Sequence, residues 1–327
     1  MARKRISIMR YAQWAIGFWL VLAALPLAAA DLNPNAEAAK VGDEVISVRQ
    51  CEREVKRIAP QLPSDPVALQ SLRRSAMQAC IDRAAALQQL AAQKEAATEA
   101  DVDQMVGRLT KQLAARDVTW EQHVAAQGLS LDEYRAEIRW GLSWAAALER
   151  HLTEENLKRV FAKSPRDFDG TRLRVAHLLL KTPAGDTSAA LQQAAAIRQQ
   201  IADKQLTFAE AAKKYSQAPT AAQGGEIGFI DRHQPMPEAF SAAAFQLAPG
   251  EVSAPVVSPA GVHLIACLEV VPGQRTFADA RDDVRTAATK ILFHHLAKRG
   301  KDGVTMKVSE QYVDSDSRAT SSAPSPR

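Results

Sequence analysis

Cysteine is scarce in this chain, and the common metal and cofactor patterns are absent. Three cysteines occur among 327 residues. None lies near histidines at the spacing of a zinc site, no glycine-rich phosphate loop occurs, and no Gly-x-Ser-x-Gly nucleophile elbow is present. The sequence therefore predicts neither a bound metal nor an organic cofactor.

The sequence also lacks an excess of positive charge once its first residues are set aside. It contains 41 Lys and Arg residues against 37 Asp and Glu residues, and the excess of four is matched by Arg3, Lys4, Arg5 and Arg10. The rest of the chain has no block of basic residues that would follow a phosphate backbone. We therefore expect no nucleic-acid partner.

Residues 1–30 have the organisation of an export signal. A basic start precedes an apolar run at 15–27, and the small residues at 28–30 form a cleavage site. Cleavage there would make Asp31 the first residue of a protein of the periplasm or cell envelope. The apolar stretch at 11–30 approaches the length that crosses a bilayer, so an uncleaved N-terminal membrane anchor is the alternative.

A long region rich in Ala and Leu follows a short predicted strand. Capping-box spacing, in which a Ser or Thr precedes a Glu or Gln by three residues, occurs at Thr119 with Gln122 and at Ser130 with Glu133. These pairs predict two helix starts. We expect a mainly helical domain over residues 31–165.

Two of the cysteines fall on neighbouring predicted helices, at 47–59 and 66–95. A turn between these helices would fold them into an antiparallel hairpin, and counting back from it places Cys51 and Cys80 near the same level. An exported protein meets oxidising conditions, so a disulfide is one hypothesis. The alternative is a pair of small apolar helix residues. Cys267 lies in an apolar strand and is expected to be a buried thiol.

The most informative stretch lies between residues 173 and 265. Four segments follow there in order: LRVAHLLLK (173–181), YSQAPTAAQGGEIGFI (215–230), MPEAF (236–240) and AAFQLAPGEVSAPVVSPAGVHLI (243–265). Their order and spacing resemble those of the parvulins, a family of peptidyl-prolyl cis–trans isomerases. The resemblance implies an α+β domain over residues 171–272, with a small, mostly antiparallel sheet flanked by helices.

The order of a strand, a helical hairpin, further helices and a parvulin unit is similar to that of the exported SurA and PrsA chaperone isomerases. This similarity implies that residues 31–165 form a chaperone-like domain. It also implies that a helix and a strand within residues 273–313 pack back on that domain. Residues 314–327 have little to bury and are expected to be disordered.

The resemblance also implies roles for individual residues. His177 and His263 would lie side by side at the floor of the active site, and Ser258 would complete their hydrogen-bond network. Ala218 occupies a position where parvulins commonly carry cysteine or aspartate. It would leave this catalytic position without a polar group and weaken the activity.

The remaining implied roles concern the binding of substrate. Met236 and Phe240 are four residues apart on a predicted helix, so they would form one apolar wall for a proline ring. An ordinary pair of core residues is the alternative reading of this spacing. Phe229 stands where an aromatic residue of the family commonly packs and is a candidate for substrate binding, and Gln234 would meet the peptide backbone.

The leading hypothesis is an exported peptidyl-prolyl isomerase with chaperone activity. Its partners would be unfolded or partly folded polypeptides that contain proline, whose uncatalysed isomerisation takes tens of seconds. Two alternatives stay open. One is a non-catalytic periplasmic holdase that binds extended peptides through a parvulin fold, which Ala218 favours. The other is a structural envelope protein tethered by its N-terminal segment.

Overall fold

The computed structural model describes residues 33–182, 187–309 and 312 and divides the chain into two compact units. The first unit runs up to Leu152 and resumes at Thr289, whereas the second comprises Thr153–Ala288. The expected signal segment and the expected tail after residue 313 lie outside the described residues. Among the described helices, none has both the length and the apolar character needed to cross a bilayer.

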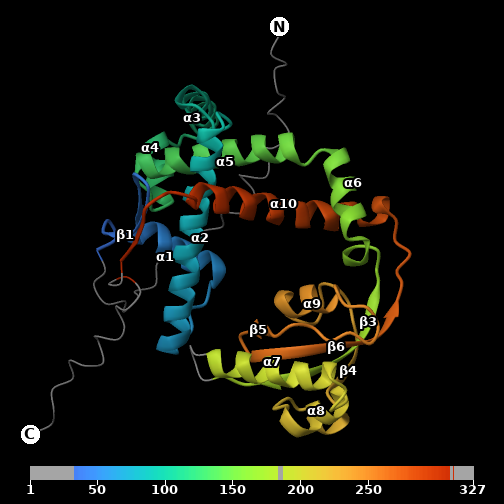
Figure 1. The fold of residues 1–327 in the computed structure, drawn as a ribbon. Helices are drawn as coiled ribbons and strands as arrows, with labels where there is room; N and C mark the ends of the chain where they lie inside the picture. Colours follow the sequence, from blue (N-terminus) through green and yellow to red (C-terminus); the bar gives the residue numbers. More distant parts are fainter. Residues whose placement is uncertain (1–32, 183–186, 310–311, 313–327) are drawn as a thin grey trace, which may run out of the picture. The chain divides into compact units, whose positions relative to one another are not determined.

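The first unit combines a small sheet with helices (Figure 1). Its strands pair antiparallel in the order β2-β1-β7, and they are β1 (Glu37–Val41), β2 (Glu44–Ser47) and β7 (Met306–Val308). Its helices are α1 (Val48–Ile58), α2 (Pro66–Ala92), α3 (Glu99–Ala114), α4 (Trp120–Ala126) and α5 (Leu131–His151). Because β7 pairs with β1, the strand at residues 306–308 completes a sheet whose other two strands lie within residues 37–47.

The helix starts of this unit follow the capping pattern seen in the sequence. The side chains of Thr119 and Ser130 each accept a hydrogen bond from the backbone N–H three residues later, at Gln122 and Glu133. The side chains of those two residues accept one in return from the capping residue's own N–H. Both predicted capping boxes are therefore confirmed.

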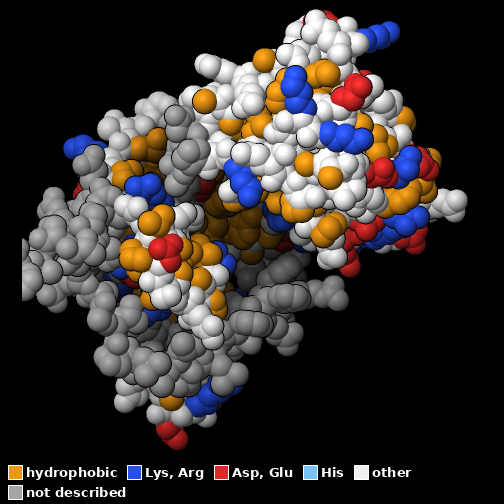
Figure 2. All heavy atoms as spheres, turned by 90° about the horizontal axis from the view of Figure 1, so that it is seen from below, with side chains coloured by type: hydrophobic (Ala, Val, Ile, Leu, Met, Phe, Trp, Pro, Cys, Tyr) orange, Lys and Arg blue, Asp and Glu red, His pale blue; other side chains and the backbone are white. Residues whose placement is uncertain are grey.

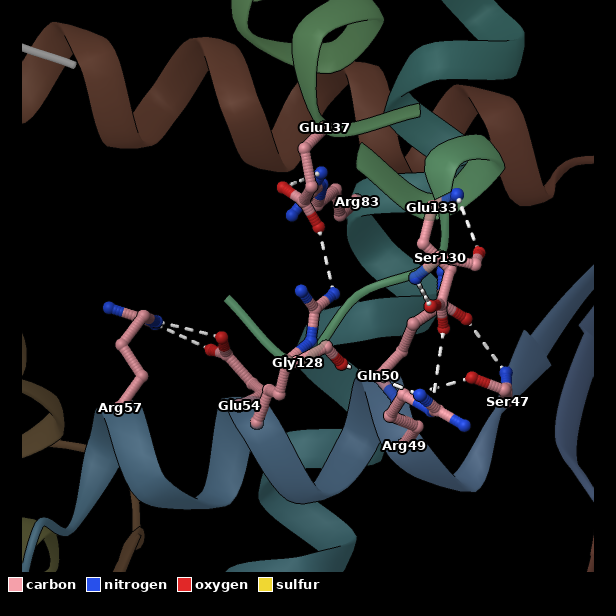
Figure 3. Close-up of polar contacts among 11 residues, drawn as sticks. Ser47, Arg49, Gln50, Glu54, Arg57, Arg83, Gly128, Ser130, Glu133 and Glu137 are labelled. Carbon is pink, nitrogen blue, oxygen red and sulfur yellow. Dashed lines mark hydrogen bonds and ion pairs between the residues drawn. The ribbon is translucent and has the colours of Figure 1, made fainter. Parts of the chain in front are cut away.

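Ion pairs connect α5 to α1 and α2 (Figure 3). Glu137 of α5 accepts a hydrogen bond from Arg53 of α1 at 3.1 Å and one from Arg83 of α2 at 2.6 Å. The Arg83 guanidinium also lies 5.1 Å from the centre of the Trp140 ring. One carboxylate thus holds two cations that would otherwise repel each other, and this arrangement joins the three helices.

The core of the first unit lies between its sheet and α1 and α2. Val41 and Cys51 have no exposed surface there, and Met77 is buried beside them. Tyr312, which follows β7 in the sequence, packs into the same cluster and is 1% exposed. Burial of an aromatic ring contributes a large apolar area, so Tyr312 attaches the end of the described chain to this core.

The second unit is built around a four-stranded antiparallel sheet in the order β4-β3-β6-β5. Its strands are β3 (Arg172–Leu180), β4 (Glu226–Ile230), β5 (Val256–Ser258) and β6 (Gly261–Val271). Its helices are α6 (Glu154–Lys163), α7 (Ser188–Ala202), α8 (Phe208–Tyr215) and α9 (Glu238–Ala244). The last long helix, α10 (Phe277–Lys301), begins in this unit and ends in the first.

Each face of this sheet is covered by a different set of helices (Figure 1). Leu178, Leu180 and Leu264 pack with residues of α7 and α8 on one face, whereas Leu173 and Ile265 pack with residues of α9 on the other. Both central strands, β3 and β6, are therefore buried on two sides. This explains why their sequences are nearly continuous apolar runs rather than alternating ones.

The exposed charges are of mixed sign. On the face drawn in Figure 2, the Lys and Arg side chains of the described residues are interspersed with Asp and Glu side chains. Some charged side chains of the chain form ion pairs, such as Arg174 with Glu226 and with Glu269, at 3.3 Å in each case. This mixture agrees with the nearly balanced composition of the chain.

Gly225 provides a test of how tightly β3 is held. Its φ is +81°, and an added Cβ would lie 2.2 Å from the carbonyl oxygen of His177. We expect Gly225→Ala to lower the free energy of unfolding by about 3 kcal/mol, because left-handed strain and a backbone clash add together. Urea denaturation of the full chain measures this change.

Gly228→Ala is the matched control. Gly228 has a similar φ of +85°, but nothing lies within 4 Å of an added Cβ. It should lose only the strain, about 1 kcal/mol. Equal losses for the two variants would show that the close approach to His177 contributes nothing to stability.

Candidate active site

Two histidines meet on the central strands of the second unit. His177 lies on β3 and His263 on β6, where the register pairs His177 with Ile265 and Leu179 with His263. The two histidines are therefore diagonal neighbours on one face of the sheet. Their rings stack with centroids 5.5 Å apart and an interplanar angle of 19°. Both side chains are buried.

A chain of hydrogen bonds connects the histidines to a serine. The Nδ1 atoms of His177 and His263 are 3.3 Å apart, and the Nε2 atom of His263 is 2.7 Å from the Oγ atom of Ser258. The Ser258 Oγ atom also accepts the N–H of Ala260 at 3.0 Å. The chain can run in either direction with one proton in each contact, provided that both rings are neutral.

Burial favours the neutral form of both rings. It lowers the pKa of His177, and it lowers the pKa of His263 to about 4, with a smaller contribution from the neighbouring His177. Both imidazoles are therefore uncharged at neutral pH. The site therefore offers polar hydrogen-bonding groups that carry no net charge.

An aromatic ring closes the apolar side of the site. Phe240 of α9 is fully buried, and its ring stands edge-on to both histidines, 5.9 Å from His177 and 5.5 Å from His263 between ring centroids. Met236 is half-buried and packs against the same cluster of apolar residues. Phe240 thus forms the inner wall, and Met236 supplies the part of the wall that solvent reaches.

The segment between α8 and β4 lies against β3. The Ser216 Oγ atom accepts the N–H of Leu179 at 3.1 Å, and Gln217 donates its backbone N–H to the Leu179 carbonyl at 2.8 Å. Ala218 follows directly and is 6% exposed. Its methyl group therefore fills a buried position and brings no hydrogen-bonding group to it.

The structure does not bring Phe229 to this cluster. Side chains alternate along a strand, and Phe229 is paired with Arg174, whereas the next pair, Leu173 and Ile230, faces the α9 side. The Phe229 ring is 44% exposed and lies 5.3 Å from the guanidinium of Arg172. Phe229 therefore lies on the opposite face of the sheet from Phe240, because the strand turns its side chain that way.

Gln234 is exposed, in the turn between β4 and α9. Its backbone carbonyl accepts the N–H of Asp231 at 3.0 Å, which closes that turn. In the same turn, Arg232 donates to both carboxylate oxygens of Glu238, at 3.0 and 2.7 Å, and to Asp167 at 3.1 Å. These contacts hold the approach to α9 and hence the position of Met236.

One supporting residue was missed in the sequence. Ser253 is 5% exposed, and its Oγ atom accepts the backbone N–H of Ile265 at 3.1 Å, while its own N–H donates to the Ile265 carbonyl at 2.8 Å. It therefore fixes the part of β6 that faces His177. A single serine in a loop has no periodicity or spacing that could have indicated this role.

Within the part of the chain that the structure describes, no group of three or more His, Cys, Asp or Glu side chains is arranged to hold a metal ion.

Comparison with known families is consistent with this geometry. Residues 177–269 match the family described as a PPIC-type PPIase domain, and residues 6–147 match the SurA-like N-terminal domain. The chain joins a SurA-like N-terminal domain to a PPIC-type PPIase domain. The PPIase match begins at one histidine of the site and includes the other, together with Ser258, Met236 and Phe240.

Individual proteins are similar to parts of this chain. The protein named Chaperone SurA from Cupriavidus metallidurans is 40% identical over 138 residues, which are 40% of this chain and 28% of that protein. Chaperone SurA from Aromatoleum aromaticum is 26% identical over 249 residues, or 71% of this chain and 55% of that protein. These matches span about half or less of the length of these relatives.

Among solved structures, the peptidylprolyl isomerase PrsA from Bacillus anthracis is 21% identical. The similarity covers 74% of this chain and 97% of that one, with a TM-score of 0.33.

The buried histidines of the PPIC-type domain should make stability depend on pH. Their pKa values in the folded state lie below 6.5, the usual value, so the unfolded chain takes up protons first as the pH falls. The stabilisation is complete above about pH 6.5 and is lost toward pH 4, by up to about 1.4 kcal/mol per pH unit for each histidine. Urea denaturation between pH 7 and 5 measures this slope.

Two variants separate this effect from other titrations. His263→Gln should flatten the plot of unfolding free energy against pH between pH 6.5 and 5, because a glutamine forms hydrogen bonds without taking up a proton. His233→Gln, at an exposed position, should leave it unchanged. Parallel curves for the wild type and His263→Gln would refute the role of the buried pair.

Proposed function

We propose that this protein is a peptidyl-prolyl cis–trans isomerase with chaperone activity, acting on unfolded or partly folded polypeptides that contain proline. The carrying observation is that one PPIC-type PPIase match, over residues 177–269, spans the two stacked histidines and the Phe240 wall. The SurA-like match over residues 6–147 supports the chaperone part. Residues 31–165 would act on exposed apolar segments, and residues 171–272 on prolyl bonds.

The physical problem in this reaction is rotation about a bond with partial double-bond character. The barrier is about 18–20 kcal/mol, and it comes from resonance between the amide nitrogen and the carbonyl. No bond is broken, so the catalyst must bind the twisted amide more tightly than the planar one. An apolar recess that holds the proline ring and excludes water from the carbonyl achieves part of this.

The residues of the site are suited to that task. In the proposed mechanism, the proline ring contacts Met236 above the ring of Phe240, whose position is set by contacts with both imidazoles. The neutral histidines and Ser258 keep one another's orientation through their hydrogen bonds. They act as positioning residues, because these two hydrogen bonds orient the imidazole rings against which Phe240 packs.

The alternative function is a holdase that binds extended peptides without accelerating rotation. Ala218 favours it, since this buried position carries no polar group that could interact with the amide or the histidines. The same apolar wall would then provide affinity alone. Catalysis distinguishes the two functions, whereas suppression of aggregation is expected from both.

Substitution of the apolar wall tests the isomerase. With short Xaa-Pro peptides, the wild type should accelerate cis-to-trans conversion, and Met236→Ala should lower kcat/KM by about tenfold, because it removes roughly 1.4 kcal/mol of apolar contact. Phe240→Leu should also lower the rate, with thermal denaturation to confirm that this buried position still folds.

Phe229→Ala is the matched control, since it removes a ring of the same domain from the opposite face of the sheet. It should retain the wild-type rate within twofold. A wild-type rate equal to the uncatalysed one, together with suppressed aggregation of an unfolded client, would replace the isomerase by the holdase.

We further propose that the protein is exported. The support is the order of basic, apolar and small residues over positions 1–30. Mass measurement of the protein isolated from a bacterial envelope fraction should identify Asp31 as the first residue. An intact leader in the membrane fraction would instead support the anchored alternative and the structural envelope role.

A further inference from the structure

Two cysteines of the first unit lie on the neighbouring helices α1 and α2 and pack on the same core cluster. Cys51 on α1 has no exposed surface and belongs to the core, and Cys80 on α2 is half-buried and packs against the same cluster. Each of the two thiols shifts the pKa of the other. Both are free thiols in this structure. The isomerase site lies in the second unit, so it does not use this pair.

The two sulfurs have different surroundings. The interaction between the two thiols lowers the pKa of Cys80 and raises that of Cys51. The charges of Arg83 and Arg53 lower the pKa of Cys80 further, against the effects of burial and of Glu54. Glu137 holds both arginines in place through its hydrogen bonds.

We propose that Cys51 and Cys80 are a redox-active pair that forms an intramolecular disulfide when the protein meets a disulfide donor. Both side chains pack on the same core cluster, on two helices that contact each other, so the bridge would join parts of the chain that already lie together. The third cysteine, Cys267, lies in the second unit on β6 and is fully buried. The inference rests on the proposed export only for the presence of a donor in the compartment.

The chemistry is thiol–disulfide exchange. The Cys80 thiolate attacks one sulfur of the donor disulfide, whose S–S bond breaks and releases one donor thiolate, leaving Cys80 joined to the other donor sulfur. Cys51 then loses its proton and attacks the Cys80 sulfur, which releases the second donor thiolate. The pair loses two electrons and two protons, and the donor disulfide gains them as two thiols. Cys80 attacks first, because it combines the lower pKa with access to solvent.

The bridge would clamp α1 to α2 within the SurA-like domain. It closes the chain between residues 51 and 80, which restricts the unfolded state and thereby stabilises the folded one. The clamped hairpin carries Arg53 and Arg83, which hold α5, and it forms one side of the core that receives Tyr312. Oxidation therefore stabilises the unit as a whole.

The test uses the full chain, first fully reduced and then treated with oxidised glutathione. We expect a mass lower by two hydrogen atoms, a linked pair of peptides containing Cys51 and Cys80, and one alkylatable cysteine in urea instead of three. The melting temperature of the bridged protein should exceed that of the reduced protein by about 5 °C or more.

Single substitutions supply the controls. Cys267→Ala should keep both the bridge and the temperature shift, whereas Cys51→Ala and Cys80→Ala should lose both. Cys80→Ala changes a half-buried position, so it keeps the test informative if Cys51→Ala does not fold. Three alkylatable cysteines after oxidation, a bridge to Cys267 or a disulfide between two chains would each overturn the proposal.

The outcome of the disulfide test does not depend on whether the protein is a catalyst. A bridged protein that does not accelerate prolyl isomerisation would contradict the proposed enzyme activity and leave the disulfide intact. Protein isolated from an envelope fraction without reductant, and alkylated at once, should already carry the bridge. If the protein accelerates prolyl isomerisation but keeps three free thiols after treatment with oxidised glutathione, the proposed redox pair is contradicted and the proposed enzyme activity stands.

Discussion

The antiparallel pairing of β3 with β6 is the interaction on which the candidate site depends. The register pairs Leu179 with His263 and therefore sets His263 diagonally across from His177. A shift by one residue would turn either imidazole to the opposite face of the sheet, among the leucines that pack on α7 and α8. The contact of Gly225 with the His177 backbone and the hydrogen bonds of Ser253 to Ile265 secure these two strands from either side.

The two buried histidines of the site avoid electrostatic repulsion because both are neutral. Two buried imidazoles in contact would repel each other strongly if both were charged, and burial alone already lowers the pKa of each. The uncharged pair can then support the ring of Phe240 in an apolar recess. Rotation about a prolyl bond moves no net charge, so an apolar and hydrogen-bonded site suits it better than a charged one. Ala218 continues this trend, since its buried side chain is a methyl group.

The first unit is held together by contacts between distant parts of the chain. Strand β7 completes the sheet that β1 and β2 begin, and Tyr312 fills the core between that sheet and α1 and α2. Glu137 joins three helices through two arginines. The same two arginines flank Cys80, so the ion pairs that assemble this unit also influence its thiol chemistry.

Much of the local structure could be predicted from the residues themselves. Capping boxes at Thr119 and Ser130 determined where helices begin, because a hydroxyl and a carboxylate or amide three residues later satisfy the free backbone N–H groups of the first turn. The order of the segments carrying His177, Gly225, Met236 and His263 sufficed to indicate a parvulin-type domain.

What the sequence could not supply was the face on which each side chain lies and the neighbour it meets. Phe229 stands beside a glycine in a strand that is irregular at its pairing with Val175, and only the register shows that its ring faces Arg172 instead of Met236. The contact of Cys51 with Cys80, the role of Ser253 and the burial of Tyr312 likewise required the packed chain. A helix start with a capping box depends on two residues three positions apart, and both can be identified in the sequence. The direction of a side chain in a sheet depends on strand pairing between residues far apart, which only the tertiary structure decides.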